Sequence, residues 1–206
     1  MYAIVTDGSI TQMFNNPKRL VIDNVQYSTK IFSLWSKSEL EAKGIYEVEF
    51  DNTNKKDEQW YINTNVSYAF ADSKVTASYG TATAKPHADS TWTTEQINAL
   101  DDPGDLQDGD IKTRGLKYNL IKDLKNDVAS ELARTDWYIT RNTEKSTAIP
   151  SSISTHRDAV RTKQAEMETS ITNAADTPAL ETLYTYTLQD DGSTTRPLGE
   201  LPTLDN

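Results

Sequence analysis

Residues 116–132 read LKYNLIKDLKNDVASEL, and this stretch decides the fold of the second half of the chain. Its leucine, isoleucine and valine residues return every three or four positions over about five turns, which is the spacing of one helical face. Lysine, aspartate and asparagine occupy many of the positions between them. We therefore expect one long amphipathic helix from about Ile111 to Trp137.

The stretch 151–174, SSISTHRDAVRTKQAEMETSITNA, carries a second helical pattern with a repeat of seven residues. Its seam mixes apolar with polar residues, which is typical of a marginal coiled coil. We interpret the seam as a packing interface, satisfied either within the chain or by symmetry mates in a trimer or ring. The predicted interface residues on this seam are Ile153, His156, Val160, Met167 and Ile171.

Turn and breaker residues divide the rest of the C-terminal half. Residues 143–150 predict the turn that joins the two long helices into a hairpin, and residues 176–178 predict the start of a third, shorter helix with proline in its first turn. The helical region is thus expected to span 111–188. Residues 189–206 contain few apolar side chains and are expected to be extended or disordered unless a partner holds them.

Residues 1–85 show the period-two alternation of β-strands. Tyr46, Val48 and Phe50 fall on one face of the clearest strand, and the glutamates between them fall on the other. We therefore predict a small antiparallel β domain at the N-terminus, followed by the helical hairpin, so that the chain belongs to the α+β class.

Aromatic residues recur in the expected strands. They favour a sheet core or an oligomer interface over a sugar-binding face, because they alternate within the strands. Trp60 and Tyr68 are the predicted interface positions in this half of the chain.

Two capping patterns indicate short helices. Ser36 followed by Glu39 is a capping box, in which each side chain satisfies a free backbone N–H of the other residue. The same pattern recurs at Thr93 and Gln96, inside the segment 86–110. That segment otherwise has the proline, glycine and aspartate content of a linker.

The composition restricts the function. The chain has a formal charge of −10, 36% hydrophobic residues and no cysteine. The negative charge disfavours nucleic acid and anionic membranes as partners, and the lack of cysteine removes disulfides, thiol catalysis and cysteine-ligated metals. No stretch approaches the ~20 apolar residues of a membrane-spanning helix, and the N-terminus lacks a signal-peptide pattern. We expect a soluble protein that is made in a cytoplasm.

No residue pattern indicates a cofactor or a metal site. His87 and His156 stand outside any catalytic or metal-binding motif. The acidic stretch 101–110 could offer oxygen ligands to Ca²⁺, but its spacing differs from that of an EF-hand loop, which favours a solvated loop. We predict no cofactor-binding and no metal-binding residue.

Two pairs of carboxylates could in principle serve glycoside hydrolysis. They are Glu47 with Glu49 and Asp57 with Glu58. Such pairs arise by chance in an acidic chain, and no sequence feature predicts a cleft around them. We therefore predict no catalytic residue and a chain that is not an enzyme.

Five stretches together resemble small tail-associated proteins of tailed bacteriophages, including the tail-fibre assembly group. They are 2–10, 31–48, 132–144, 147–150 and 156–161. The resemblance covers about half of the chain and implies a β-rich N-terminal part, a helix, a Thr-Asp-Trp turn and a second helix with regularly spaced arginines. In that arrangement we expect Trp137 to pack beneath the turn that ends the first helix.

Three functions remain open. The first is a virion component, such as a tail-fibre adaptor, baseplate or connector protein, which binds other phage tail proteins and forms a homo-oligomer in the tail. The second is an assembly chaperone that binds a tail fibre transiently. The third is a receptor-binding or glycan-binding tail protein. We favour the first, because the chain is longer and richer in linkers than a compact chaperone requires.

Overall fold

The computed structural model describes residues 1–204 and divides into two compact units, Met1–Thr83 and Ala84–Asn206. Both helices and strands are present, which confirms the α+β class. Within residues 1–204, no helix combines the length and the apolar character needed to cross a membrane.

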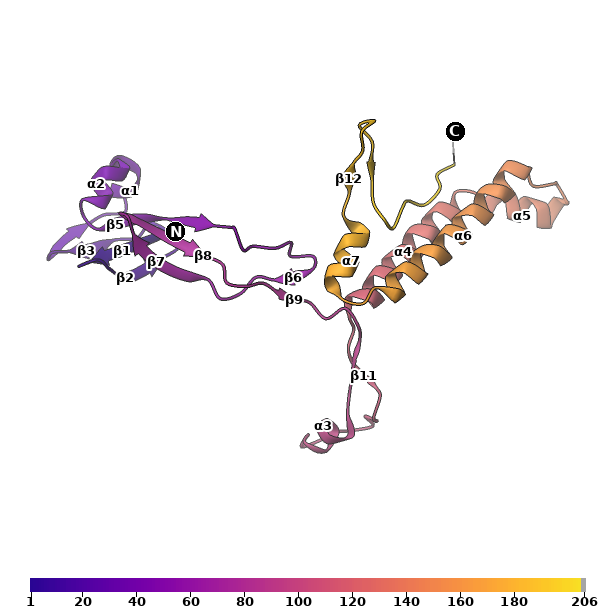
Figure 1. Cartoon of the computed structure of the whole chain (residues 1–206), viewed down its shortest axis with the longest axis horizontal. Helices are drawn as coiled ribbons and strands as arrows, with labels where there is room; N and C mark the ends of the chain where they lie inside the picture. Colours follow the sequence, from indigo (N-terminus) through magenta and orange to yellow (C-terminus); the bar gives the residue numbers. More distant parts are fainter. Residues whose placement is uncertain (205–206) are drawn as a thin grey trace. The chain divides into compact units, whose positions relative to one another are not determined.

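A five-stranded sheet forms the centre of the first unit (Figure 1). Its strands follow the order β2-β1-β5-β8-β7, and β2 and β7 at the two edges also contact each other, so the sheet is curled. The strands are β1 (Tyr2–Thr6), β2 (Ser9–Phe14), β5 (Ile45–Asp51), β7 (Ser67–Ala71) and β8 (Lys74–Ser78).

The prediction of an antiparallel sheet is wrong at one position, because β5 and β8 run parallel with Val48 opposite Val75. The chain crosses from β5 to β7, then turns through Asp72 and Ser73, which both have positive φ. The resulting β7–β8 hairpin inserts β8 between β7 and β5. Parallel neighbours need such a crossover connection, and the local pattern of alternation carries no information about it.

Both faces of the sheet bury apolar side chains. Ala3, Val48 and Val75 belong to the cluster on one face, which also includes Tyr46, whereas Ile45 belongs to the cluster on the other face. The second face is covered by short elements that contribute Leu20, Ile31 and Trp35. These elements are β3 (Leu20–Ile22), β4 (Val25–Tyr27), α1 (Ile31–Leu34) and α2 (Lys37–Glu41).

The capping box at the start of α2 is confirmed: the Glu39 carboxylate accepts from the Ser36 N–H at 2.7 Å, and the Ser36 hydroxyl accepts from the Glu39 N–H. Gly44 follows α2 with φ +72°. A Cβ atom there would lie 2.5 Å from the carbonyl oxygen of Val5, so only glycine allows β1 to approach this closely. Two further strands, β6 (Tyr61–Ile62) and β9 (Thr83–Ala84), form a short ribbon.

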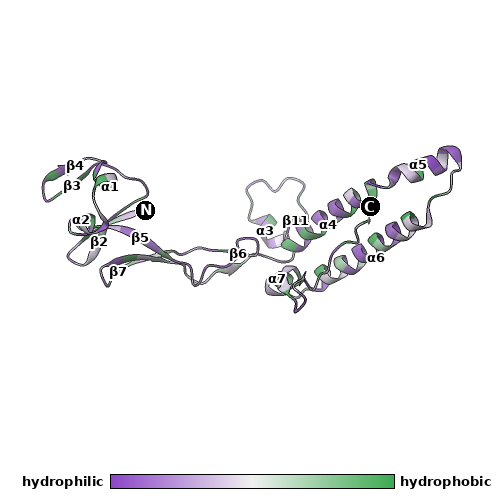
Figure 2. Ribbon diagram, turned by 90° about the horizontal axis from the view of Figure 1, so that it is seen from above, coloured by the Kyte–Doolittle hydropathy of each residue, from purple (hydrophilic) through white to green (hydrophobic). Residues whose placement is uncertain are grey.

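Two antiparallel helices dominate the second unit. Lys117 Nζ donates to the carbonyl of Thr172 at 2.7 Å near one end, and His156 Nε2 lies 2.9 Å from Glu131 near the other. Figure 2 shows apolar residues returning along both helices. The helices of this unit are α3 (Thr94–Asn98), α4 (Leu116–Ala133), α5 (Asp136–Lys145), α6 (Ser151–Asn173) and α7 (Thr177–Tyr184).

The long helix expected from Ile111 to Trp137 is shorter at both ends. Its first residues instead form β11 (Ile111–Thr113), which pairs with β10 (Ser90–Thr91), because an extended partner satisfies their backbone groups. At the other end Thr135 has φ −118° and ψ 3°, which breaks the helix before α5 begins. The turn that was expected from residue 143 therefore starts only after Lys145.

The segment expected as a linker forms an arm that is closed at its base. The Asp89 carboxylate accepts from the Gly115 N–H at 2.7 Å and from Arg114 at 2.6 Å. The Thr93 hydroxyl caps α3 as predicted, accepting from the Gln96 N–H at 3.3 Å. The prediction that Gln96 completes this capping box is wrong, because its side-chain oxygen accepts from Lys112 Nζ instead.

The third helix, α7, begins where the sequence predicts, with the Asp176 carboxylate accepting from the Ala179 N–H at 2.8 Å. Beyond it, β12 (Thr187–Leu188) and β13 (Thr194–Thr195) form a ribbon. The chain then folds back, burying Leu198, whose N–H donates to the carbonyl of Leu183. The tail is thus held by its own helices as far as residue 204, and the last two residues of the predicted tail lie outside the described part.

Candidate docking surface on helix α5

A polar corner, formed by residues around Arg157, joins the start of α5 to α6. The Arg157 side chain is only 8% exposed, and its Nη1 lies 2.8 Å from the Leu132 carbonyl and 2.7 Å from the Thr135 hydroxyl. The same nitrogen lies 2.8 Å from a carboxylate oxygen of Asp136, the first residue of α5. One buried guanidinium therefore holds both the end of α4 and the beginning of α5.

Glu131 extends this corner along α4. Its carboxylate accepts from Arg134 at 2.9 Å, lies 2.9 Å from His156 Nε2 and accepts from the backbone N–H of Leu204 in the returning tail. Burial raises the pKa of Glu131, but the hydrogen bonds and the charge of its neighbours outweigh this effect and bring the pKa below its usual value. The ionised carboxylate therefore links α4, α6 and the tail.

Helix α5 presents an aromatic and cationic surface next to this corner. Trp137 is 50% exposed and Ile139 is 38% exposed. The rings of Trp137 and Tyr138 lie 3.7 Å apart between centroids, and the Arg141 guanidinium lies 4.9 Å from the Trp137 centroid and 5.7 Å from that of Tyr138. We call Trp137, Tyr138 and Arg141, which contact one another, the α5 surface.

The expectation that Trp137 packs beneath a turn is therefore wrong. The chain continues as a helix after Thr135, so Trp137 falls in the first turn of α5 and stacks against Tyr138 and Arg141 instead. Tryptophan, tyrosine and arginine are the residue types that contribute most to protein–protein binding. The α5 surface is thus chemically suited to docking.

The structure places the five seam residues of α6 inside the molecule. All five are buried between α6 and its neighbours in the second unit, and the two long helices pack along this seam. The seam is thus satisfied within the chain and is not accessible to a symmetry mate. These residues are Ile153, His156, Val160, Met167 and Ile171.

The two interface positions predicted in the first unit differ in exposure. Trp60 is 3% exposed, whereas Tyr68 on β7 is 41% exposed. Only Tyr68 is therefore accessible to a partner. Neither belongs to the same unit as the α6 seam.

Three of the four carboxylates that could have served catalysis, Glu49, Asp57 and Glu58, have structural partners. Glu49 pairs with Lys37 at 3.2 Å and with Lys74 at 3.3 Å, and these hydrogen bonds and charges lower the pKa of Glu49. The Asp57 carboxylate accepts from the Gln59 N–H, and Glu58 pairs with Lys55.

Three carboxylates of the acidic stretch 101–110 accept hydrogen bonds from backbone N–H groups. Asp102, Asp108 and Asp110 accept from the N–H groups of Gly104, Thr94 and Gln107. Within residues 1–204, no group of three or more histidine, aspartate or glutamate side chains is arranged to hold a metal ion.

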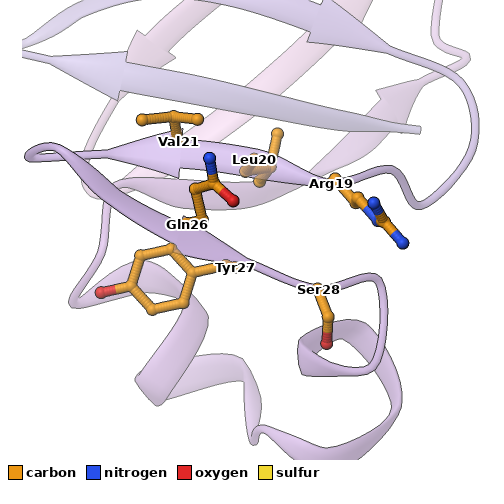
Figure 3. A pocket seen from close by; sticks show the side chains of 6 residues that line it. All are labelled: Arg19, Leu20, Val21, Gln26, Tyr27 and Ser28. Carbon is orange, nitrogen blue, oxygen red and sulfur yellow. The ribbon is translucent and has the colours of Figure 1, made fainter.

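An open hollow of about 430 Å³ lies on the β3–β4 ribbon (Figure 3). Arg19, Val21 and Gln26 are among its lining residues, and the Arg19 side chain points away from the ribbon. The lining residues that the structure describes include Tyr27 and Ser28 but no aspartate, glutamate or histidine.

Comparisons of the chain with models of protein families, with curated protein sequences and with solved structures gave no match.

Proposed function

We propose that this chain is a non-enzymatic structural component of a tailed-phage virion, such as a tail-fibre adaptor, a baseplate protein or a connector, and that it acts by docking to other tail proteins. The observation that carries the proposal is the half-exposed Trp137 on a helix whose first residue is held by the buried Arg157. An exposed indole on a positioned helix is a preorganised binding element.

The geometry supports docking for a physical reason. The exposed Trp137 on this short helix gains the free energy of apolar burial only when a partner covers it. The contacts of Arg157 restrict the direction in which α5 leaves the helical pair. Helix α5 therefore loses little conformational entropy when a partner binds. Both features are expected of a part that binds neighbours in an assembly.

The phage origin rests on the sequence resemblance. The stretches 132–144 and 156–161, which carry much of it, also supply Thr135, Asp136 and Arg157 of the corner. In this proposal the N-terminal part acts as a β domain and the C-terminal part as a helical hairpin with a coiled-coil-like seam. The partners are other tail proteins, with further copies of this chain in the same tail, and the location is the virion.

Peptide mass spectrometry of purified virions tests the proposal, with this chain quantified against the major tail protein. We expect a fixed ratio of a few to a few dozen copies per particle. Absence from particles, together with a complex between this chain and fibre protein in infected-cell lysate, would replace the proposal with the assembly chaperone.

A further inference from the structure

We propose that the α5 surface binds an acidic segment of another protein, in which a carboxylate pairs with Arg141 and a neighbouring apolar side chain covers Trp137. This inference rests on the proposed docking function and specifies the chemistry of the partner.

Arg141 differs from the other arginines of the second unit. Among the described residues of that unit, every other arginine has a carboxylate partner, and Arg141 has none. Its Nε is also buried without a hydrogen-bond acceptor. The paired arginines are Arg114 with Asp89, Arg134 with Glu131, Arg157 with Asp136, Arg161 with Asp158, and Arg196 with Glu200.

A partly buried guanidinium without a counter-charge is unfavourable, because it has lost hydration and gained no ion pair. The Arg141 guanidinium carbon lies over the rings of Trp137 and Tyr138, at 4.9 and 5.7 Å from their centroids. The N–H groups lie in the plane of the guanidinium, which is the geometry that a carboxylate accepts through two parallel hydrogen bonds. A partner carboxylate would supply the counter-charge at the terminal Nη atoms, whereas the buried Nε lies out of its reach.

The chemistry of the partner follows from local charge complementarity, because Arg141 has no carboxylate partner among the described residues. The net charge of −10 opposes every acidic partner at long range and is screened by salt, so the contact at Arg141 decides the choice. In line with the proposed function, the partner is another tail protein, and cross-linking distinguishes it from a second copy of this chain.

Carbodiimide coupling of particles that carry the Arg141→Lys variant tests the chemistry of the partner. Coupling joins the Nζ of the introduced lysine to an activated carboxyl carbon with net loss of water, so a zero-length cross-link forms only to a carboxylate in direct contact. We expect peptide mass spectrometry to find residue 141 linked to an aspartate or glutamate of another tail protein. A link to a second copy of this chain, or no link at all, would overturn the inference.

Charge reversal in purified particles provides the second measurement. We expect Arg141→Glu to lower the number of incorporated copies at least tenfold, whereas Arg19→Glu, an exposed arginine of the first unit, leaves it unchanged. Circular dichroism of the purified variants checks that both remain folded. If the Arg141→Glu variant is incorporated into particles as well as the wild-type chain is, the inference is overturned and the proposed function is not. Absence of wild-type chain from particles would overturn the proposed function and this inference together.

Discussion

The seam between α4 and α6 and the α5 end of this helical pair are built by different interactions. Along the seam, Val160, Met167 and Ile171 are buried in apolar packing. At the α5 end, Arg157 and Glu131 connect elements through charged hydrogen bonds. Apolar packing is non-directional and contributes mainly to stability, whereas a buried guanidinium fixes directions. The comparison indicates that the seam holds the unit together and the corner positions the α5 surface.

The largest expected effect comes from breaking the seam with Ile171→Ala. Ile171 is fully buried, so the substitution should lower the free energy of unfolding by about 2–5 kcal/mol. Urea denaturation followed by far-UV circular dichroism measures the loss. The matched control is Ile139→Ala on the exposed surface of α5, which should change stability by less than about 0.5 kcal/mol. Equal losses in the two variants would contradict the assignment of the seam as core.

A smaller and more local effect is expected from Arg157→Met. The variant loses hydrogen bonds from a charged group, worth about 1.5–3 kcal/mol in total, while the apolar stem remains. Hydrogen exchange should become faster at the amides of α5 and remain unchanged in the middle of α6. Arg161→Met, which removes an exposed arginine from the same helix, should leave both regions unchanged. Uniformly faster exchange in α4, α5 and α6 would show that the corner contributes general stability and does not position α5.

The smallest effect concerns the pH dependence of the corner. The pKa of Glu131 is lower in the folded state, so its carboxylate contributes stability fully above the usual glutamate pKa of 4.5. That contribution disappears as the pH falls below 4.5 and through the folded pKa. Glu131→Gln should therefore be less stable than the wild type at pH 7, by about 0.5–1.5 kcal/mol. Urea midpoints at several pH values should converge for the two proteins in acid, and a constant difference at every pH would contradict this role.

The seam could be predicted from the sequence because it depends on a local repeat. Ile153, Val160 and Met167 stand seven residues apart and are all buried in the structure. The prediction also includes His156, although its partner Glu131 was missed. A signal existed, since residues of an antiparallel pair lie opposite each other when they are about equally far from its midpoint, which for Glu131 with His156 and for Lys117 with Thr172 falls near residue 144.

Non-local pairing explains the remaining errors. Ile111 fits the helical period, yet it becomes a strand because Thr91 is available to pair with it. The parallel pairing of β5 with β8 likewise depends on where the β7–β8 hairpin returns to the sheet. The sequence around Val48 does not indicate this position. The break at Thr135 did have a local signal, because threonine followed by aspartate is a common helix start.

Hydrogen exchange of the wild-type chain, free and within purified virions, shows whether α5 is the docking surface. We expect residues 136–145 to become protected in the particle, because a partner covers Trp137 and Arg141. The amides in the middle of α6 should exchange equally slowly in both states, because they are already buried. Unchanged exchange in α5, with new protection elsewhere on the chain, would contradict the claim that α5 is the docking surface.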